Sequence, residues 1–80
     1  MITIEVFSGE CRQCEQIADN SRAALAALEL HGEVIAVADQ EEILERGITI
    51  TPALVINGDL ESMGRVPELT EIVMWLQEIE

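Results

Sequence analysis

The chain has 80 residues, which predicts one domain, because a chain this short buries only about 60% of its unfolded surface and cannot divide that core. An apolar content of 49% is too high for a disordered tail, so we expect a single domain over residues 1–80. Four arginines stand against 16 acidic residues, lysine is absent, and the net charge is −12. This charge repels phosphate backbones and anionic lipids, which excludes nucleic acid and membrane surfaces as partners and favours basic proteins.

The sequence lacks features of export or membrane insertion. Its longest unbroken apolar run covers residues 23–28, far short of the roughly 20 residues that span a bilayer. The N-terminus begins directly with a strand-like pattern instead of a signal peptide. We therefore expect a cytoplasmic protein.

The first half of the chain predicts two strands joined by a helix. Residues 2–7 alternate with a period of two and end at Ser8-Gly9, which is typical of a strand. Residues 11–30 change to a helical period, and we expect Gly32 to end this helix in the left-handed conformation. One arc of about 120° on that helix contains Cys14, Ile17, Ala18, Ser21, Ala24, Leu25 and Leu28. Residues 34–38 are continuously apolar, as expected of a strand covered on both faces.

A short helix follows the second strand. Asp39 is expected to cap its N-terminus, with Glu42 three residues later in a capping-box arrangement. The helix should run to Arg46, and Gly47 should end it.

The last part of the chain predicts a β-hairpin and a helix. Asn57-Gly58 separates residues 53–56 from residues 59–63, and a type I′ turn needs positive φ at both of those positions. Pro67 is expected in the first turn of the final helix, whose apolar stripe is Leu69, Ile72, Val73, Leu76 and Ile79. The order is β-α-β-α-β-β-α, in which the first three elements form a right-handed parallel unit and the hairpin extends the sheet antiparallel.

Cys11 and Cys14 are the only cysteines. A disulfide across so short a loop would stabilise the fold by only about 2 kcal/mol, so stapling is not its main purpose. The remaining uses are thiol-disulfide exchange, metal binding and simple burial. Cys11 lies at a helix N-terminus, whose N–H groups and dipole favour a thiolate. The helical wheel places Cys14 toward the core and Cys11 on its shoulder, an asymmetry that suits a resolving and an attacking thiol.

Neighbouring charges should tune these thiols. Arg12 should stabilise the thiolate, whereas Glu10 and Glu15, with the acidic chain as a whole, should raise the thiol pKa.

Metal binding by the same cysteines is the alternative. A structural zinc site needs two more ligands, and His31 lies some 30 Å away along the helix at a rise of 1.5 Å per residue. A four-thiol zinc site across a dimer, or a linear copper(I) site on two thiolates, uses only these cysteines. A metal-binding or delivery domain is therefore the second hypothesis.

Several separated segments carry a family resemblance. Cys11-Arg12-Gln13-Cys14 follows a strand, Thr51-Pro52 precedes another, and Asn57-Gly58 and Gly64 occur in and after the hairpin. Together they resemble the landmarks of the thioredoxin superfamily. Specifically, the chain resembles the small redox-active disulfide proteins of this superfamily, which also carry the Thr-Pro-Ala-Leu-Val-Ile-Asn-Gly and Gly-Arg-Val-Pro segments.

The resemblance implies a minimal thioredoxin/glutaredoxin-like α/β fold, with a four-stranded mixed sheet and helices on both faces. It implies that Cys11 is the nucleophile, that Cys14 is the resolving thiol, and that the Thr51-Pro52 bond is cis. Thr51 and Pro52 would bind an extended substrate, and Gly64 would line the same groove. The activity implied is thiol-disulfide exchange through a redox-active Cys11-Cys14 disulfide, without metal or organic cofactor. The partners implied are a disulfide-containing client and an upstream reductase, and the protein itself is expected to be a monomer.

The chain departs from thioredoxins proper around the thiols. Glu10 replaces a tryptophan, and Arg12-Gln13 replaces Gly-Pro, so these three residues are expected to tune the thiol pKa. Residues 34–38 contain no acid that could deprotonate Cys14, and only the flanking Glu33 and Asp39 could do so. Beyond the hairpin, Arg65 is expected to be solvated, with contact to an acidic substrate peptide as the alternative.

Overall fold

Seven elements follow one another in the predicted order. The computed structural model describes residues 1–9 and 11–79, and of Cys11 it describes only the backbone. The elements are β1 (Ile2–Phe7), α1 (Cys11–Ala27), β2 (Gly32–Val37), α2 (Gln40–Glu45), β3 (Ala53–Ile56), β4 (Asp59–Met63) and α3 (Leu69–Ile79). The strands form a single sheet in the order β2-β1-β3-β4. β1 pairs parallel with β2 and antiparallel with β3, so the sheet is mixed, as predicted.

The main core lies between the sheet and the pair of helices α1 and α3. Alternate side chains of β1, among them Ile4 and Val6, point toward these helices and are fully buried, as is Leu54 of β3. The predicted apolar arc of α1 is confirmed, because Cys14, Ile17, Ala18, Ser21, Ala24 and Leu25 are buried and Leu28 is half-buried. The alternation of β1 and the helical period of α1 thus meet in one apolar layer.

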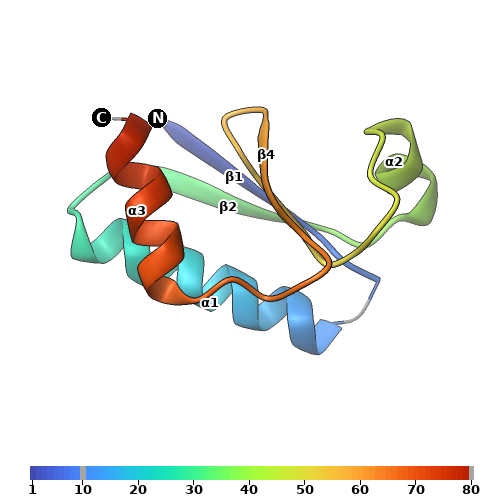
Figure 1. Ribbon diagram of the computed structural model, residues 1–80, viewed down its shortest axis with the longest axis horizontal. Helices are drawn as coiled ribbons and strands as arrows, with labels where there is room; N and C mark the ends of the chain where they lie inside the picture. Colours follow the sequence, from blue (N-terminus) through green and yellow to red (C-terminus); the bar gives the residue numbers. More distant parts are fainter. Residues whose placement is uncertain (10, 80) are drawn as a thin grey trace.

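The second face of the sheet is covered only at one end. There Phe7 packs with Val37, Ile43 of α2, Ile48, Ala53 and Val55. Helices therefore lie on both faces, and Figure 1 shows α2 at the end of the molecule opposite α3. The expectation that residues 34–38 are covered on both faces is wrong. β2 is an edge strand and the six-residue α2 does not extend along it, so Ile35 remains 40% exposed.

The end of α1 differs from the prediction. The helix stops at Ala27 rather than near Leu30, and Glu29 takes the left-handed conformation with φ 55°. The Leu30 N–H donates to the Leu25 carbonyl at 2.9 Å and the Glu29 N–H donates to the Ala26 carbonyl at 3.1 Å. These two bonds are a Schellman motif, in which the left-handed position usually belongs to glycine.

Gly32, expected at that position, instead begins β2. A Cβ atom there would lie 2.9 Å from the Ile2 carbonyl oxygen and 3.0 Å from Leu25 Cδ2. Glycine is required because β2 passes so close to β1 and α1. The corresponding prediction for α2 is confirmed, since Gly47 ends that helix with φ 78° and the Asp39 side chain accepts a bond from the Glu41 N–H at its start.

The hairpin turn has the predicted geometry and an additional contact. Asn57 and Gly58 have φ 50° and 87°, both positive as a type I′ turn requires. The Asn57 N–H donates to the Thr3 carbonyl at 2.8 Å, and the Thr3 N–H donates to Asn57 Oδ1 at 2.9 Å. The turn residue therefore continues the ladder between β3 and β1.

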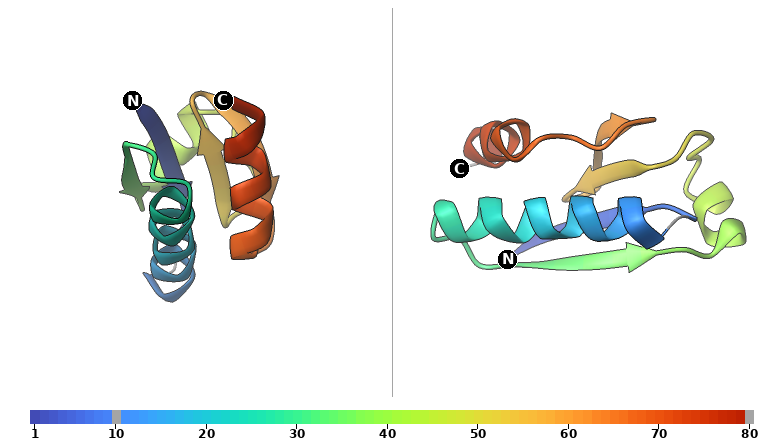
Figure 2. Two further views of the ribbon diagram at one scale, coloured as in Figure 1. Left: turned by 90° about the vertical axis from the view of Figure 1, so that its left-hand side faces the viewer. Right: turned by 90° about the horizontal axis from the view of Figure 1, so that it is seen from below.

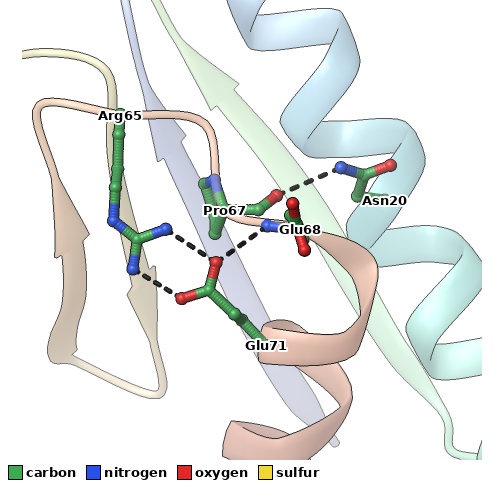
Figure 3. Close-up of polar contacts among 5 residues, drawn as sticks. All are labelled: Asn20, Arg65, Pro67, Glu68 and Glu71. Atoms are coloured by element: carbon green, nitrogen blue, oxygen red, sulfur yellow. Dashed lines mark hydrogen bonds and ion pairs between the residues drawn. The ribbon is translucent and has the colours of Figure 1, made fainter.

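Glu71 organises the start of α3 (Figure 3). Its carboxylate accepts the Glu68 N–H at 3.1 Å and both terminal Arg65 nitrogens, at 2.7 and 2.6 Å. Arg65 is therefore engaged in an ion pair rather than simply solvated. Pro67 lies before the helix and not in its first turn, and its carbonyl accepts a bond from Asn20 Nδ2 of α1 at 3.1 Å.

A bidentate ion pair closes the less covered face of the sheet. Arg46, just after α2, donates to both carboxylate oxygens of Glu5 on β1 at 2.7 and 2.8 Å. Its guanidinium also lies 5.1 Å from the centre of the Phe7 ring. The hydrogen bonds from Arg46 hold the pKa of Glu5 below its ordinary value of 4.5.

We predict that replacing Glu29 by glycine stabilises the protein. The substitution removes left-handed strain of roughly 1–2 kcal/mol but adds backbone entropy to the unfolded chain, leaving a net gain of about 0.5–1 kcal/mol. Urea denaturation would measure this gain. Glu29→Ala removes the charge but keeps the strain, and Ala26→Gly places glycine within the helix. A loss of stability in Glu29→Gly comparable to that in Ala26→Gly would contradict the prediction.

We also predict a specific acid sensitivity from the Glu5-Arg46 pair. Because the pKa of Glu5 is lower in the folded than in the unfolded protein, its stabilisation is complete above about pH 4.5 and is lost as the pH falls through the folded pKa. The stability difference between the wild type and Glu5→Gln should therefore shrink as the pH is lowered from 6 to 3. Denaturant titrations at each pH would measure it, with Glu45→Gln on α2 as the charge-matched control.

Candidate functional site

At one end of the sheet, β1 and β2 end and β3 begins. Phe7, the last residue of β1, is paired with Val37 on one side and Ala53 on the other. The segments that follow β1 and β2 therefore lie beside the segment that enters β3. α1 begins at this same end with Cys11, so its N-terminus is positioned by the end of the central strand.

Cys14 lies in the first turn of α1 and is only 8% exposed, which confirms that this thiol is shielded. It borders a pocket of about 210 Å³, which is lined by Ser8, Cys14, Glu15, Ala36 and Ala38. Most of this lining is apolar, and Ser8 itself is 2% exposed. The pocket lies between the first turns of α1 and the end of β2.

Glu10, Arg12 and Gln13 were predicted to tune the pKa of the thiols. Arg12 is exposed and Gln13 is half-buried. Glu10 and the side chain of Cys11, which was expected to be exposed, lie outside the described part of the chain.

The segment before β3 has the geometry that the resemblance implied. The Thr51-Pro52 bond is cis, with Pro52 buried and Thr51 exposed. The Gly64 N–H donates to the Pro52 carbonyl at 2.8 Å, so a hydrogen bond joins these two predicted substrate-binding residues. Gly64 has φ 85°, and a Cβ there would lie 3.2 Å from Ile50 Cγ2, which explains why glycine occupies the position.

The sequence analysis missed the two alanines that line the pocket. Ala36 lies on the side of β2 that faces α1, and Ala38 follows one residue after the end of β2, so both line the pocket. Their small size was a detectable signal, since larger residues there would fill the space beside Cys14. Neither acid that flanks this segment lies beneath the thiol: Glu33 is exposed at the opposite end of β2, and Asp39 caps α2.

The described part of the chain has neither a metal-binding cluster nor a membrane-spanning helix. Within residues 1–9 and 11–79, no group of three or more histidine, cysteine, aspartate or glutamate residues could hold a metal ion. No helix in that part of the chain is long and apolar enough to cross a membrane.

Comparison with known proteins identifies the family. Residues 2–77 match the thioredoxin domain family. The chain is 33% identical over 72 residues to a thioredoxin of Methanothermobacter thermautotrophicus, covering 90% of this chain and 94% of that protein. It is 29% identical over 72 residues to a thioredoxin of Methanocaldococcus jannaschii, covering 90% and 83% respectively. The chain therefore belongs to the thioredoxin domain family, whose shared chemistry is thiol-disulfide exchange.

Proposed function

We propose that this protein is a thiol-disulfide oxidoreductase that acts on protein disulfides through Cys11 and Cys14. The observation that carries the proposal is the position of Cys14, which is buried in the first turn of α1 at the edge where the cis Thr51-Pro52 segment enters the sheet. A shielded thiol one helical turn from the helix start suits a resolving role, because it is inaccessible to client proteins but within reach of Cys11.

The exchange proceeds in two steps. The Cys11 thiolate attacks one sulfur of the client disulfide, forming a Cys11-client bond, and the other client sulfur leaves as a thiolate that takes up a proton. Cys14 then loses its proton and attacks the Cys11 sulfur, which closes the Cys11-Cys14 disulfide and releases the second client thiol. Two electrons pass from the protein to the client, and an upstream reductase must return them.

The helix N-terminus supplies the electrostatic basis for the first step. The N-terminal N–H groups and the positive dipole end of the 17-residue α1 favour an anion at Cys11. Arg12 adds a positive charge, and the interval between the cysteines contains no acid. Glu10, Arg12 and Gln13 are the residues we propose to tune the thiol pKa.

The cis segment is proposed to hold the client. Thr51 is exposed and its backbone groups can bind an extended peptide, while the bond from Gly64 to Pro52 fixes the shape of this segment. Thr51, Pro52 and Gly64 would therefore orient the client disulfide toward Cys11.

The partners should present basic surfaces. The chain carries −12, and Arg22, Arg46 and Arg65 form ion pairs with acids of the chain itself. A cytoplasmic location and a monomeric state complete the proposal.

We predict that Cys14→Ser accumulates mixed disulfides with client proteins. Without the resolving thiol, the bond between Cys11 and the client persists, whereas Cys11→Ser should trap nothing. Incubation with a lysate, followed by alkylation and non-reducing electrophoresis, would reveal the adducts. Cys11→Ser/Cys14→Ser measures the background, and equal trapping by the two single variants would overturn these roles.

We predict that the cysteine pair has one two-electron transition at a potential between roughly −180 and −300 mV, the range of exchange proteins. Equilibration in graded dithiol/disulfide buffers, thiol alkylation and intact-mass analysis would measure it. A pair that stays reduced throughout, together with a stoichiometric copper(I) or zinc complex that resists a chelator, would instead support the metal-binding alternative.

A further inference from the structure

We propose that the outer edge of β2 is a docking strand for an extended basic peptide segment, which inserts an apolar side chain into the pocket beside Cys14. The inference rests on the proposed function, because it names a further contact by which a client would dock beside the cysteine pair. It differs from the cis Thr51-Pro52 contact, which lies on the other side of β1.

β2 has an open side within the described structure. It is the first strand of the sheet, and both views of Figure 2 show it (green) at the margin of the drawn ribbon. On its inner side, the His31 carbonyl accepts the Ile2 N–H and the Val37 carbonyl accepts the Ser8 N–H, both at 3.1 Å. Because backbone groups alternate in a strand, the N–H and carbonyl groups of Val34 and Ala36 point outward.

The two edges of the sheet are protected to different degrees. The β4 edge contains an irregularity in its pairing opposite Leu54 and Val55 and carries Asp59 and Glu61, features that discourage further pairing. β2 carries one acid, Glu33, near its start, whereas residues 34–38 have no charge and no proline, and β2 pairs with β1 in unbroken register. The unprotected edge is therefore the one beside Cys14.

The pocket provides the side-chain contact. Ala36 pairs with Val6, whose side chain faces α1, so the side chain of Ala36 lies on the same face of the sheet. An added strand would lie about 4.8 Å outside β2, with its own side chains beside those of β2. The side chain opposite Ala36 would then enter the apolar pocket of about 210 Å³ that reaches Cys14. Valine or leucine fits such a space.

The surrounding charge selects a basic segment. Glu33 lies exposed on β2, and Asp39, Glu41 and Glu42 lie exposed directly beyond it. The nearby Arg46 pairs with Glu5, so its positive charge does not offset these four acids. A second copy of this chain would bring like charges together, which disfavours pairing of β2 with itself. Lysine or arginine flanking the inserted residue is therefore expected.

A synthetic peptide tests the proposal without exchange chemistry. The probe alternates lysine and valine over about seven residues, has a central leucine, and contains no sulfur. Titration into the reduced, ¹⁵N-labelled protein should shift the Val34 and Ala36 amides and slow their hydrogen exchange. Substitution of glutamate for lysine in the peptide should abolish binding.

Matched probes establish how the peptide binds. N-methylation of the peptide amides that face β2 should weaken binding at least tenfold, equivalent to about 1.4 kcal/mol, whereas methylation of the alternate amides should not. Ala36→Leu, which fills the pocket, should weaken binding by a similar factor. Ala23→Leu, at an exposed position of α1, adds the same bulk and should bind normally.

Two results would overturn the proposal. One is peptide-induced shifts confined to residues around Pro52 and Gly64. The other is a concentration-dependent dimer of the protein alone that protects the β2 amides, which would make a second copy the occupant. If the proposed exchange function is wrong, Cys14→Ser traps no clients but the peptide still binds. If the proposed docking strand is wrong, the peptide does not bind but Cys14→Ser still traps a small disulfide. The two proposals therefore fail separately.

Discussion

The position of β1, which is hydrogen-bonded on both sides, buried along the face toward α1 and α3, and buried on the other face at Phe7, is the constraint on which the rest of the structure depends. Ile4, Val6 and Phe7 have no exposed surface, and burying each such side chain contributes roughly 1.5–3 kcal/mol. A shift of β1 by one residue would turn Thr3 and Glu5 toward the helices. Such a shift would also move the start of α1. The core that stabilises the fold therefore also positions the cysteine pair.

The few arginines of the chain affect both its stability and its proposed choice of partners. Arg46 forms a bidentate ion pair with Glu5 of β1. Arg65 forms a second one with Glu71, whose carboxylate also caps the start of α3. Because these cations are committed within the fold, they do little to offset the acidic surface. The net charge of −12 would then accelerate association with the proposed basic partners and oppose self-association.

Two segments of different chemistry flank β1 at the end of the sheet where α1 begins. On one side of β1, the cis segment is held by the bond from Gly64 to Pro52. On the other side, β2 presents an unpaired edge and a pocket bordered by Ala36. A client that used both sides would be fixed in orientation over the helix N-terminus. Geometry of this kind converts a bimolecular encounter into a directed attack on sulfur.

Local patterns in the sequence determined the order of the elements, the buried arc of α1 and the type I′ turn, because each depends on residues near one another in the chain. The Thr51-Pro52 geometry was predicted only through a family resemblance. Tertiary structure alone decided that Gly32 avoids a clash and that Ile35 remains exposed. These features depend on which distant segment packs against each residue. The same reason explains the pocket beside Cys14, since its walls come from α1 and β2 and no single segment contains it.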